Sequence, residues 1–108
     1  MDERWGLTTM VKVEVVVGGE DAAAVTDVFK AAGAVGFTAV ANVSGFGHAG
    51  YHQGRLAFND KNGLVLLMVV LPEEGAADLV AGLRTLLDRR PGVLFVSDTY
   101  VSRPGYFR

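Results

Sequence analysis

The strongest constraint on the fold is an uninterrupted apolar run, LVLLMVVL, from Leu64 to Leu71. Gly63 precedes the run and Pro72 follows it, so it is far shorter than the roughly 20 residues that a membrane-spanning helix needs. A run of this length that is rich in valine and leucine is typical of a central β-strand covered on both faces. The fold therefore has to place an apolar layer on each side of this strand.

The segments around this run predict an α+β domain. Period-two and β-branched segments predict the other strands, and apolar residues at helical spacing predict the helices. The predicted strands are 10–17, 37–46, 64–71 and 93–96, with 98–102 as an extension, and the predicted helices are 21–32 and 72–88. This order is that of the ferredoxin-like βαββαβ fold, an antiparallel sheet with two helices on one face. Because both helices lie on one face, the run leaves the other face apolar, which predicts self-association.

The 108 residues fit one domain, with an N-terminal tail over 1–9, the domain body over 10–103 and a C-terminal tail over 104–108. Between the second and third strands, residues 47–63 form a polar, glycine-rich loop, with a short hairpin predicted at Arg55–Phe58. Loops of this length in small domains are usually functional or disordered. The loop is therefore a candidate for the working part of the molecule.

Composition and motifs exclude several classes of protein. The sequence holds no cysteine, which excludes disulfides, thiolate zinc sites and cysteine nucleophiles, and its net charge of -2 argues against nucleic-acid binding. It contains no metalloprotease, Walker, Rossmann or nucleophile-elbow spacing, so we expect no enzymatic activity. Its apolar runs suit neither a secretion signal nor a membrane span, so we expect a cytoplasmic protein.

Two pairs of side chains are candidates for binding, each with a plainer alternative. His48 and His52 are four residues apart in the loop; they either ligate a metal ion through their imidazoles or are two solvated residues. Arg89 and Arg90 follow the second helix, where they either offset the helix dipole or clamp an anion such as phosphate. The residues alone leave both choices open.

The segment from Gly36 to Gly54, GFTAVANVSGFGHAGYHQG, resembles the PII signalling superfamily. In that family a Gly-apolar-Thr entry to the second strand and a Gly-Phe-Gly exit lead into a mobile T-loop. The likeness extends from Val11 to Arg103 in the element order given above. It implies a homotrimer whose sheets pack around a threefold axis, which would cover the apolar face. It also implies adenine-nucleotide binding in the clefts between subunits.

The resemblance further implies which residues contact the nucleotide. They are Gly36, Thr38, Ser44, Gly45, Phe46, Gly47, Gly92, Val93 and Arg103. Glycine at such positions lets backbone N–H groups approach anionic oxygens. One extra residue between Thr38 and Gly45 departs from the family pattern and predicts a β-bulge.

A second departure lies where the family usually has Thr-Gly-x-x-Gly-Asp-Gly-Lys. Here residues 88–93 read Asp-Arg-Arg-Pro-Gly-Val, so Val93 stands near the place of the lysine that binds phosphate. Arg89 and Arg90 are candidates to replace its charge. The chain therefore resembles a divergent PII-like protein.

The short loop and small size are similar to PII-like members linked to carboxysomes and bicarbonate transport. This likeness implies a non-enzymatic regulator that binds ADP or AMP, with ATP and bicarbonate as further candidate ligands. Ordering of loop 47–63 would control a partner such as a membrane transporter for inorganic carbon. The alternative is a metal-responsive trimer, PII-like or similar to the divalent-cation tolerance family, that uses His48 and His52. A small ferredoxin-like enzyme and a ligand-free scaffold are further alternatives.

Overall fold

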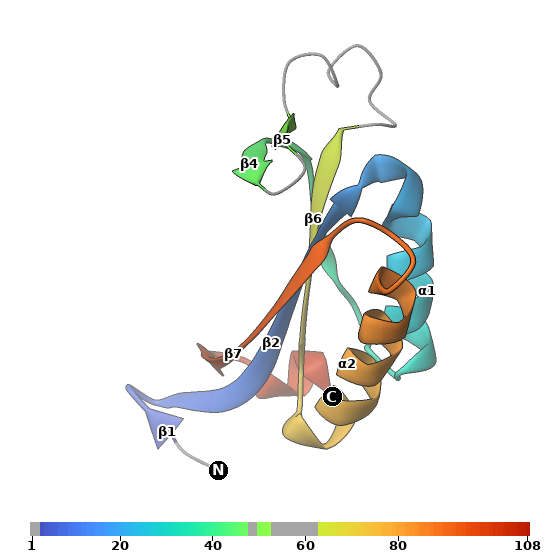
Figure 1. Cartoon of the computed structure of the whole chain (residues 1–108). Helices are drawn as coiled ribbons and strands as arrows, with labels where there is room; N and C mark the ends of the chain where they lie inside the picture. Colours follow the sequence, from blue (N-terminus) through green and yellow to red (C-terminus); the bar gives the residue numbers. More distant parts are fainter. Residues whose placement is uncertain (1–2, 48–49, 53–62) are drawn as a thin grey trace.

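The computed structural model of the chain describes residues 3–47, 50–52 and 63–108. Within them, an antiparallel sheet carries both helices on one face, as Figure 1 shows. The strands are β1 (Glu3–Arg4), β2 (Leu7–Gly18), β3 (Thr38–Val43), β4 (Gly45–Gly47), β5 (Gly50–His52), β6 (Leu64–Leu71) and β7 (Val93–Val101). The helices are α1 (Ala22–Ala31) and α2 (Glu73–Leu87), with the short 3-10 helices η1 (Gly19–Asp21) and η4 (Pro104–Phe107). The predicted ferredoxin-like fold is confirmed.

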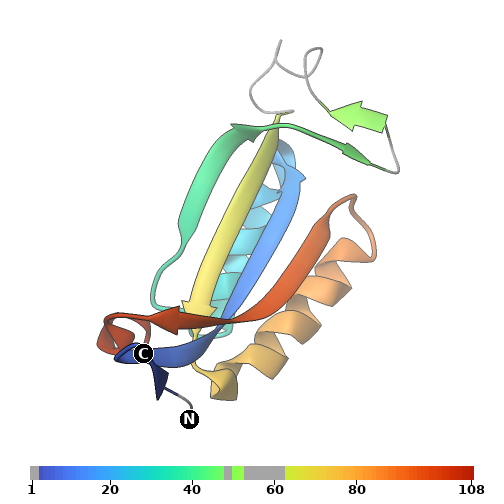
Figure 2. The ribbon, with the colours of Figure 1, turned by 90° about the vertical axis from the view of Figure 1, so that its left-hand side faces the viewer.

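The main sheet has the strand order β7–β2–β6–β3, which Figure 2 shows from the face away from the helices. β2 and β6 are therefore the central strands, and β3 and β7 are the edges. β1 pairs with the first residues of β2, and β4 and β5 form a separate hairpin. The apolar run that constrained the fold is β6, with the predicted bounds of Leu64 and Leu71.

The core lies between the central strands and the two helices. Its buried residues are Val11, Val13, Val15, Val17, Val25, Phe29, Leu67, Val69, Leu71, Leu79 and Leu83. Alternate residues belong to this layer from Val11 to Val17 of β2 and from Leu67 to Leu71 of β6, because successive side chains of a strand point to opposite faces. Both strands therefore present their remaining side chains to the other face of the sheet.

That other face, which we call the open face, is the sheet surface away from the helices. Its apolar side chains include Val16, Val40, Leu66, Met68, Val70 and Phe95, as the strand register requires. Val40 and Phe95 are 45% and 56% exposed. Within a single chain, β6 is therefore buried on the helix side from Leu67 to Leu71, whereas Leu66, Met68 and Val70 on the open face are only partly buried.

The N-terminal segment differs from the tail predicted for residues 1–9. Glu3 and Arg4 pair with the start of β2, and Trp5 (φ 54°) and Gly6 (φ 71°) form the turn between the two strands. Positive φ at both residues is the geometry of a tight hairpin turn, in which asparagine and glycine are usual and tryptophan is not. The sequence therefore lacked the ordinary signal for this hairpin. The Trp5 ring meets the ring of Tyr100 edge-on, with centroids 5.4 Å apart, which ties the hairpin to β7.

The strand predicted over 37–46 divides into β3 and β4. The register between β3 and β6 shifts between Ala41 and Val43, and Asn42 takes a positive φ of 61° there. Asparagine tolerates this conformation better than most residues. The predicted β-bulge between Thr38 and Gly45 is therefore confirmed. The hairpin predicted at Arg55–Phe58 lies outside the described residues.

Candidate functional site

The connection between α2 and β7 is packed tightly against the end of β2. Gly92 has a φ of +147°, a backbone conformation that is nearly exclusive to glycine. A Cβ atom on this residue would lie 2.8 Å from Val17 Cγ1 and 2.9 Å from the Val16 carbonyl oxygen. Glycine is therefore required here, and it holds the segment with Arg89, Arg90 and Val93 close to the end of the sheet.

Arg90 is already engaged by its own chain. Its Nε atom lies 3.1 Å from Asp21 Oδ1, and the Asp21 side chain is only 14% exposed, against 42% for Arg90. Asp21 directly precedes α1, yet its side chain makes no capping hydrogen bond to that helix. The carboxylate of Asp21 therefore pairs with Arg90 and does not cap the helix. This ion pair links the α2–β7 connection to the start of α1.

Arg89 is in a different position from Arg90. It is exposed, and it makes no ion pair within the part of the chain that the structure describes. The structure thus divides the predicted arginine clamp into a tethered Arg90 and an unpaired Arg89. The role of Asp21 was missed because it depends on a contact between residues far apart in the sequence.

The Gly-Phe-Gly segment and Gly92 lie at the same end of the sheet. Across that end, Val43 pairs with Leu64, Leu64 pairs with Gly18, and the nearby Val16 pairs with Val93. Ser44, which is exposed, follows β3 here, and Gly45–Gly47 form β4 immediately afterwards. However, β3 and β7 are the two edges of the sheet, separated by three strand spacings or about 14 Å.

Gly36 and Thr38 are exposed where the chain enters β3. Thr38 pairs with Met68, which places it at the level of Glu14 and Phe95, partway along the sheet. Thr38 therefore lies on the edge opposite β7 and away from the end that carries Gly92.

Arg103 follows the far end of β7. Val93 pairs with Val16 and Val101 pairs with Thr8, so the two ends of β7 lie about 27 Å apart at 3.4 Å per residue. The Arg103 guanidinium carbon lies 5.7 Å from the centroid of the Tyr106 ring of η4. A single chain therefore does not bring Arg103 to Gly92.

Large apolar side chains are exposed near both edges of the sheet. Val35, Phe37 and Val40 lie before or on β3, and Val93, Phe95 and Val96 lie on β7. Among the residues whose burial the structure describes, 3–44 and 63–108, Trp5 and Tyr106 are the other large hydrophobics of comparable exposure. The predicted site residues thus lie in three separate places: along and after the β3 edge, at the Gly92 end of β7, and beyond the far end of β7.

The metal hypothesis receives no support from the described residues. His52 is the last residue of β5, and His48 lies outside the described ranges. Over residues 3–47, 50–52 and 63–108, no three side chains of the kinds that ligate metals come together. Over the same ranges, neither helix is long and apolar enough to cross a membrane.

Comparison with known proteins supports the resemblance found in the sequence. Residues 10–106 match the family model described as nitrogen regulatory protein P-II. No curated protein matches the sequence.

Solved structures agree with the family match. One, CPII of Thiomonas intermedia K12 bound to ADP, AMP and bicarbonate, is 35% identical, with 94% of this chain and 96% of that chain covered and a TM-score of 0.87. Another structure of CPII, bound to ADP and bicarbonate, is 33% identical with 94% and 97% coverage and a TM-score of 0.83. A PII-like signaling protein from Thermus thermophilus shares the fold at 17% identity, with 94% and 98% coverage and a TM-score of 0.78.

Proposed function

Because the chain belongs to the nitrogen regulatory protein P-II family, we propose that it is a non-enzymatic regulator that binds ADP or AMP between copies of itself. The similar protein CPII has been crystallised with ADP, AMP and bicarbonate. The residues of this chain that fit such a ligand are the glycines at 36, 45, 47 and 92 with Thr38, Ser44, Phe46, Val93, Arg89 and Arg103.

The observation that carries this proposal is the separation of the proposed ligand residues on one chain. Gly92 lies at one end of the β7 edge, whereas Thr38 lies on the β3 edge and Arg103 lies beyond the far end of β7. A nucleotide that contacts all of them needs a second chain to supply the missing half. The site is therefore a property of the assembly.

The exposed apolar side chains favour a ring as that assembly. The two sheet edges carry different residues, so an interface between them joins two unlike surfaces. Such an interface propagates from copy to copy until the rotation closes, which gives a cyclic oligomer. A homotrimer in which the open faces turn inward also removes Val16, Leu66 and Met68 from water.

The charges near Gly92 favour ligands with few phosphates. Val93 stands where the family usually has a phosphate-binding lysine, and Arg90 is paired with Asp21. Within the part of the chain that the structure describes, Arg89 is then the arginine left for phosphate beside Gly92, with Arg103 supplied from another copy. ADP and AMP should bind more tightly than ATP, and bicarbonate is a candidate second anion.

Binding would be read out by a partner protein. Ligand contacts at the base of loop 47–63 would order that loop, and partner affinity and nucleotide affinity are then reciprocally linked. A membrane transporter for inorganic carbon is the partner class that we propose, for a regulator acting in the cytoplasm. An affinity in the micromolar range, about -8 kcal/mol, is sufficient for such a sensor.

Calorimetry tests the proposal with ADP, AMP and ATP, each with and without bicarbonate. We expect saturable binding of ADP and AMP, a stoichiometry of one nucleotide per chain, and weaker binding of ATP. Arg103→Ala should lose affinity, whereas Arg84→Ala, which changes an exposed arginine on α2, is the matched control and should bind as wild type. Absence of binding by all three nucleotides would refute the proposal.

A further inference from the structure

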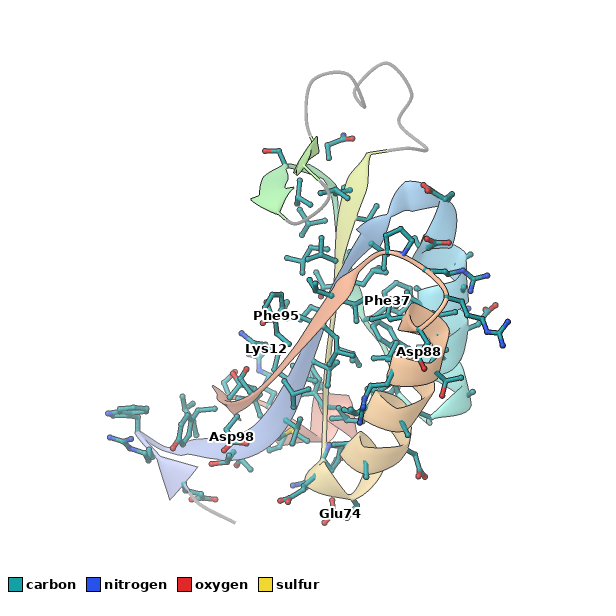
Figure 3. All side chains as sticks on the ribbon, viewed as in Figure 1. Lys12, Phe37, Glu74, Asp88, Phe95 and Asp98 are labelled. Atoms are coloured by element: carbon teal, nitrogen blue, oxygen red, sulfur yellow. The ribbon has the colours of Figure 1, made fainter. Side chains whose placement is uncertain are left out.

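Two charged residues interrupt the apolar open face at its centre. Lys12 and Glu14 lie on the central strand β2, at the positions that alternate with the buried Val11, Val13 and Val15. Figure 3 shows Lys12 together with Phe95 on the side of the sheet away from the helices. Any surface that packs against the open face therefore has to provide partners for these two charges.

Most neighbours of the pair on the open face are apolar. Glu14 lies between Met68 of β6 and Phe95 of β7, and Lys12 lies between Val70 of β6 and Ser97 of β7. These neighbours already remove much of the water, since the side chains of Lys12 and Glu14 are only 30% and 29% exposed. Further covering would leave the two charges with little solvation.

The ion pair within one chain is long. Lys12 Nζ lies 4.0 Å from Glu14 Oε1, and within the described residues neither side chain forms an ion pair with any other group. An ammonium has three donors and a carboxylate accepts several hydrogen bonds, so both groups have capacity for a second partner. If the face were covered by purely apolar groups, the cost of burying these charges would remain uncompensated.

From this arrangement we propose that Lys12 of one copy pairs with Glu14 of the next, so that the open faces meet through a closed ring of alternating charges. A second copy of the chain is the partner that fits, because it brings one charge of each sign in the same apolar setting. In a ring, every Lys12 then lies between its own Glu14 and that of a neighbour. The pairing fixes the register of the subunits, which apolar contacts alone define poorly. This inference rests on the self-assembly in the proposed function and adds the residues that specify it.

Charge reversal with complementation tests the pairing. Lys12→Glu gives a chain with two carboxylates on the open face, and Glu14→Lys gives a chain with two ammonium groups. Each variant alone should dissociate, with a trimer dissociation constant raised at least about 100-fold, as for a buried pair that has lost one partner. The double variant Lys12→Glu/Glu14→Lys should assemble as wild type. An equimolar mixture of the two single variants should recover part of the assembly as trimers that contain both chains.

The masses are measured by light scattering and native mass spectrometry at several chain concentrations, with circular dichroism to confirm folding. Lys30→Glu and Asp78→Lys make the same charge changes on exposed positions of α1 and α2, and they should leave the trimer intact. Lys12→Met/Glu14→Met gives a second readout: it should assemble at least as well as wild type, whereas either methionine alone should weaken assembly. The methionine variants still test the pairing if a charge-reversed variant fails to fold.

The outcomes separate this inference from the proposed function. Two results would overturn the Lys12–Glu14 pairing and leave the nucleotide proposal standing. In the first, the wild type is a trimer and the single variants have the same mass. In the second, the single variants dissociate, and neither mixing them nor combining them in the double variant restores the trimer. A monomeric wild type would overturn both. Trimers that weaken in each single variant and return in the double variant are the result that we expect.

Discussion

Gly92 offers the most quantitative test of how the candidate site is built. In Gly92→Ala, the new Cβ would approach Val17 Cγ1 to 2.8 Å, the Val16 carbonyl oxygen to 2.9 Å and Leu87 Cδ2 to 3.1 Å. The backbone oxygen belongs to β2, which is paired on both sides, so it cannot shift without disturbing the sheet. A side chain at a φ of +147° costs about 1–3 kcal/mol. Overpacking in a well-packed region costs a further 1–3 kcal/mol or so.

The variant should therefore lose about 2–6 kcal/mol of unfolding free energy, which is a large fraction of the roughly 5–15 kcal/mol that domains possess. Urea unfolding followed by circular dichroism measures the loss, at one fixed chain concentration because assembly adds to apparent stability. Gly105→Ala is the matched control, since Gly105 has no atom within 4 Å of an added Cβ and no positive φ. A Gly92→Ala chain that unfolds at the same urea concentration as wild type would refute the packing argument.

Three further substitutions have defined outcomes. Phe29→Ala removes a fully buried ring from the core and should lower the unfolding free energy by about 3–5 kcal/mol, measured by urea unfolding; a loss below about 1 kcal/mol would contradict its place in the core. Asp21→Asn breaks the partly exposed ion pair with Arg90 and should lower the unfolding free energy by at most about 1 kcal/mol, and by less at high salt, in the same urea unfolding assay. A larger loss would contradict the assignment of this pair as a weak surface contact. Arg103→Ala should weaken ADP binding about 10- to 150-fold in calorimetry with unchanged unfolding, and unaltered affinity would remove Arg103 from the site.

The fold was largely predictable because strong local signals bound its central elements. Leu64–Leu71 is a strand with the predicted bounds, since Gly63 and Pro72 stop it and its valine and leucine content suits a central position. The predicted bulge near Asn42 came from the resemblance, since the chain has one residue more between Thr38 and Gly45 than the family pattern. The strand was therefore predicted from its own residues, and the bulge from the comparison with the family.

The features that were not predicted depend on unusual backbone conformation or on distant contacts. The N-terminal hairpin turns at Trp5, a residue that rarely adopts a positive φ, so no turn signal marked it. The sequence did not show that Arg90 is paired and Arg89 is not, because the partner of Arg90, Asp21, comes from the start of the other helix. Likewise, only the strand register shows that Gly92 and Arg103 lie at opposite ends of β7.

The most direct test of the account is a crystal structure of the chain grown with ADP. The account predicts a trimer with ADP at each junction, where one chain contributes Gly92 and Arg89 and the neighbouring chain contributes Thr38 and Arg103. ADP held by the residues of a single chain, or a chain that crystallises with ADP as a monomer, would contradict it.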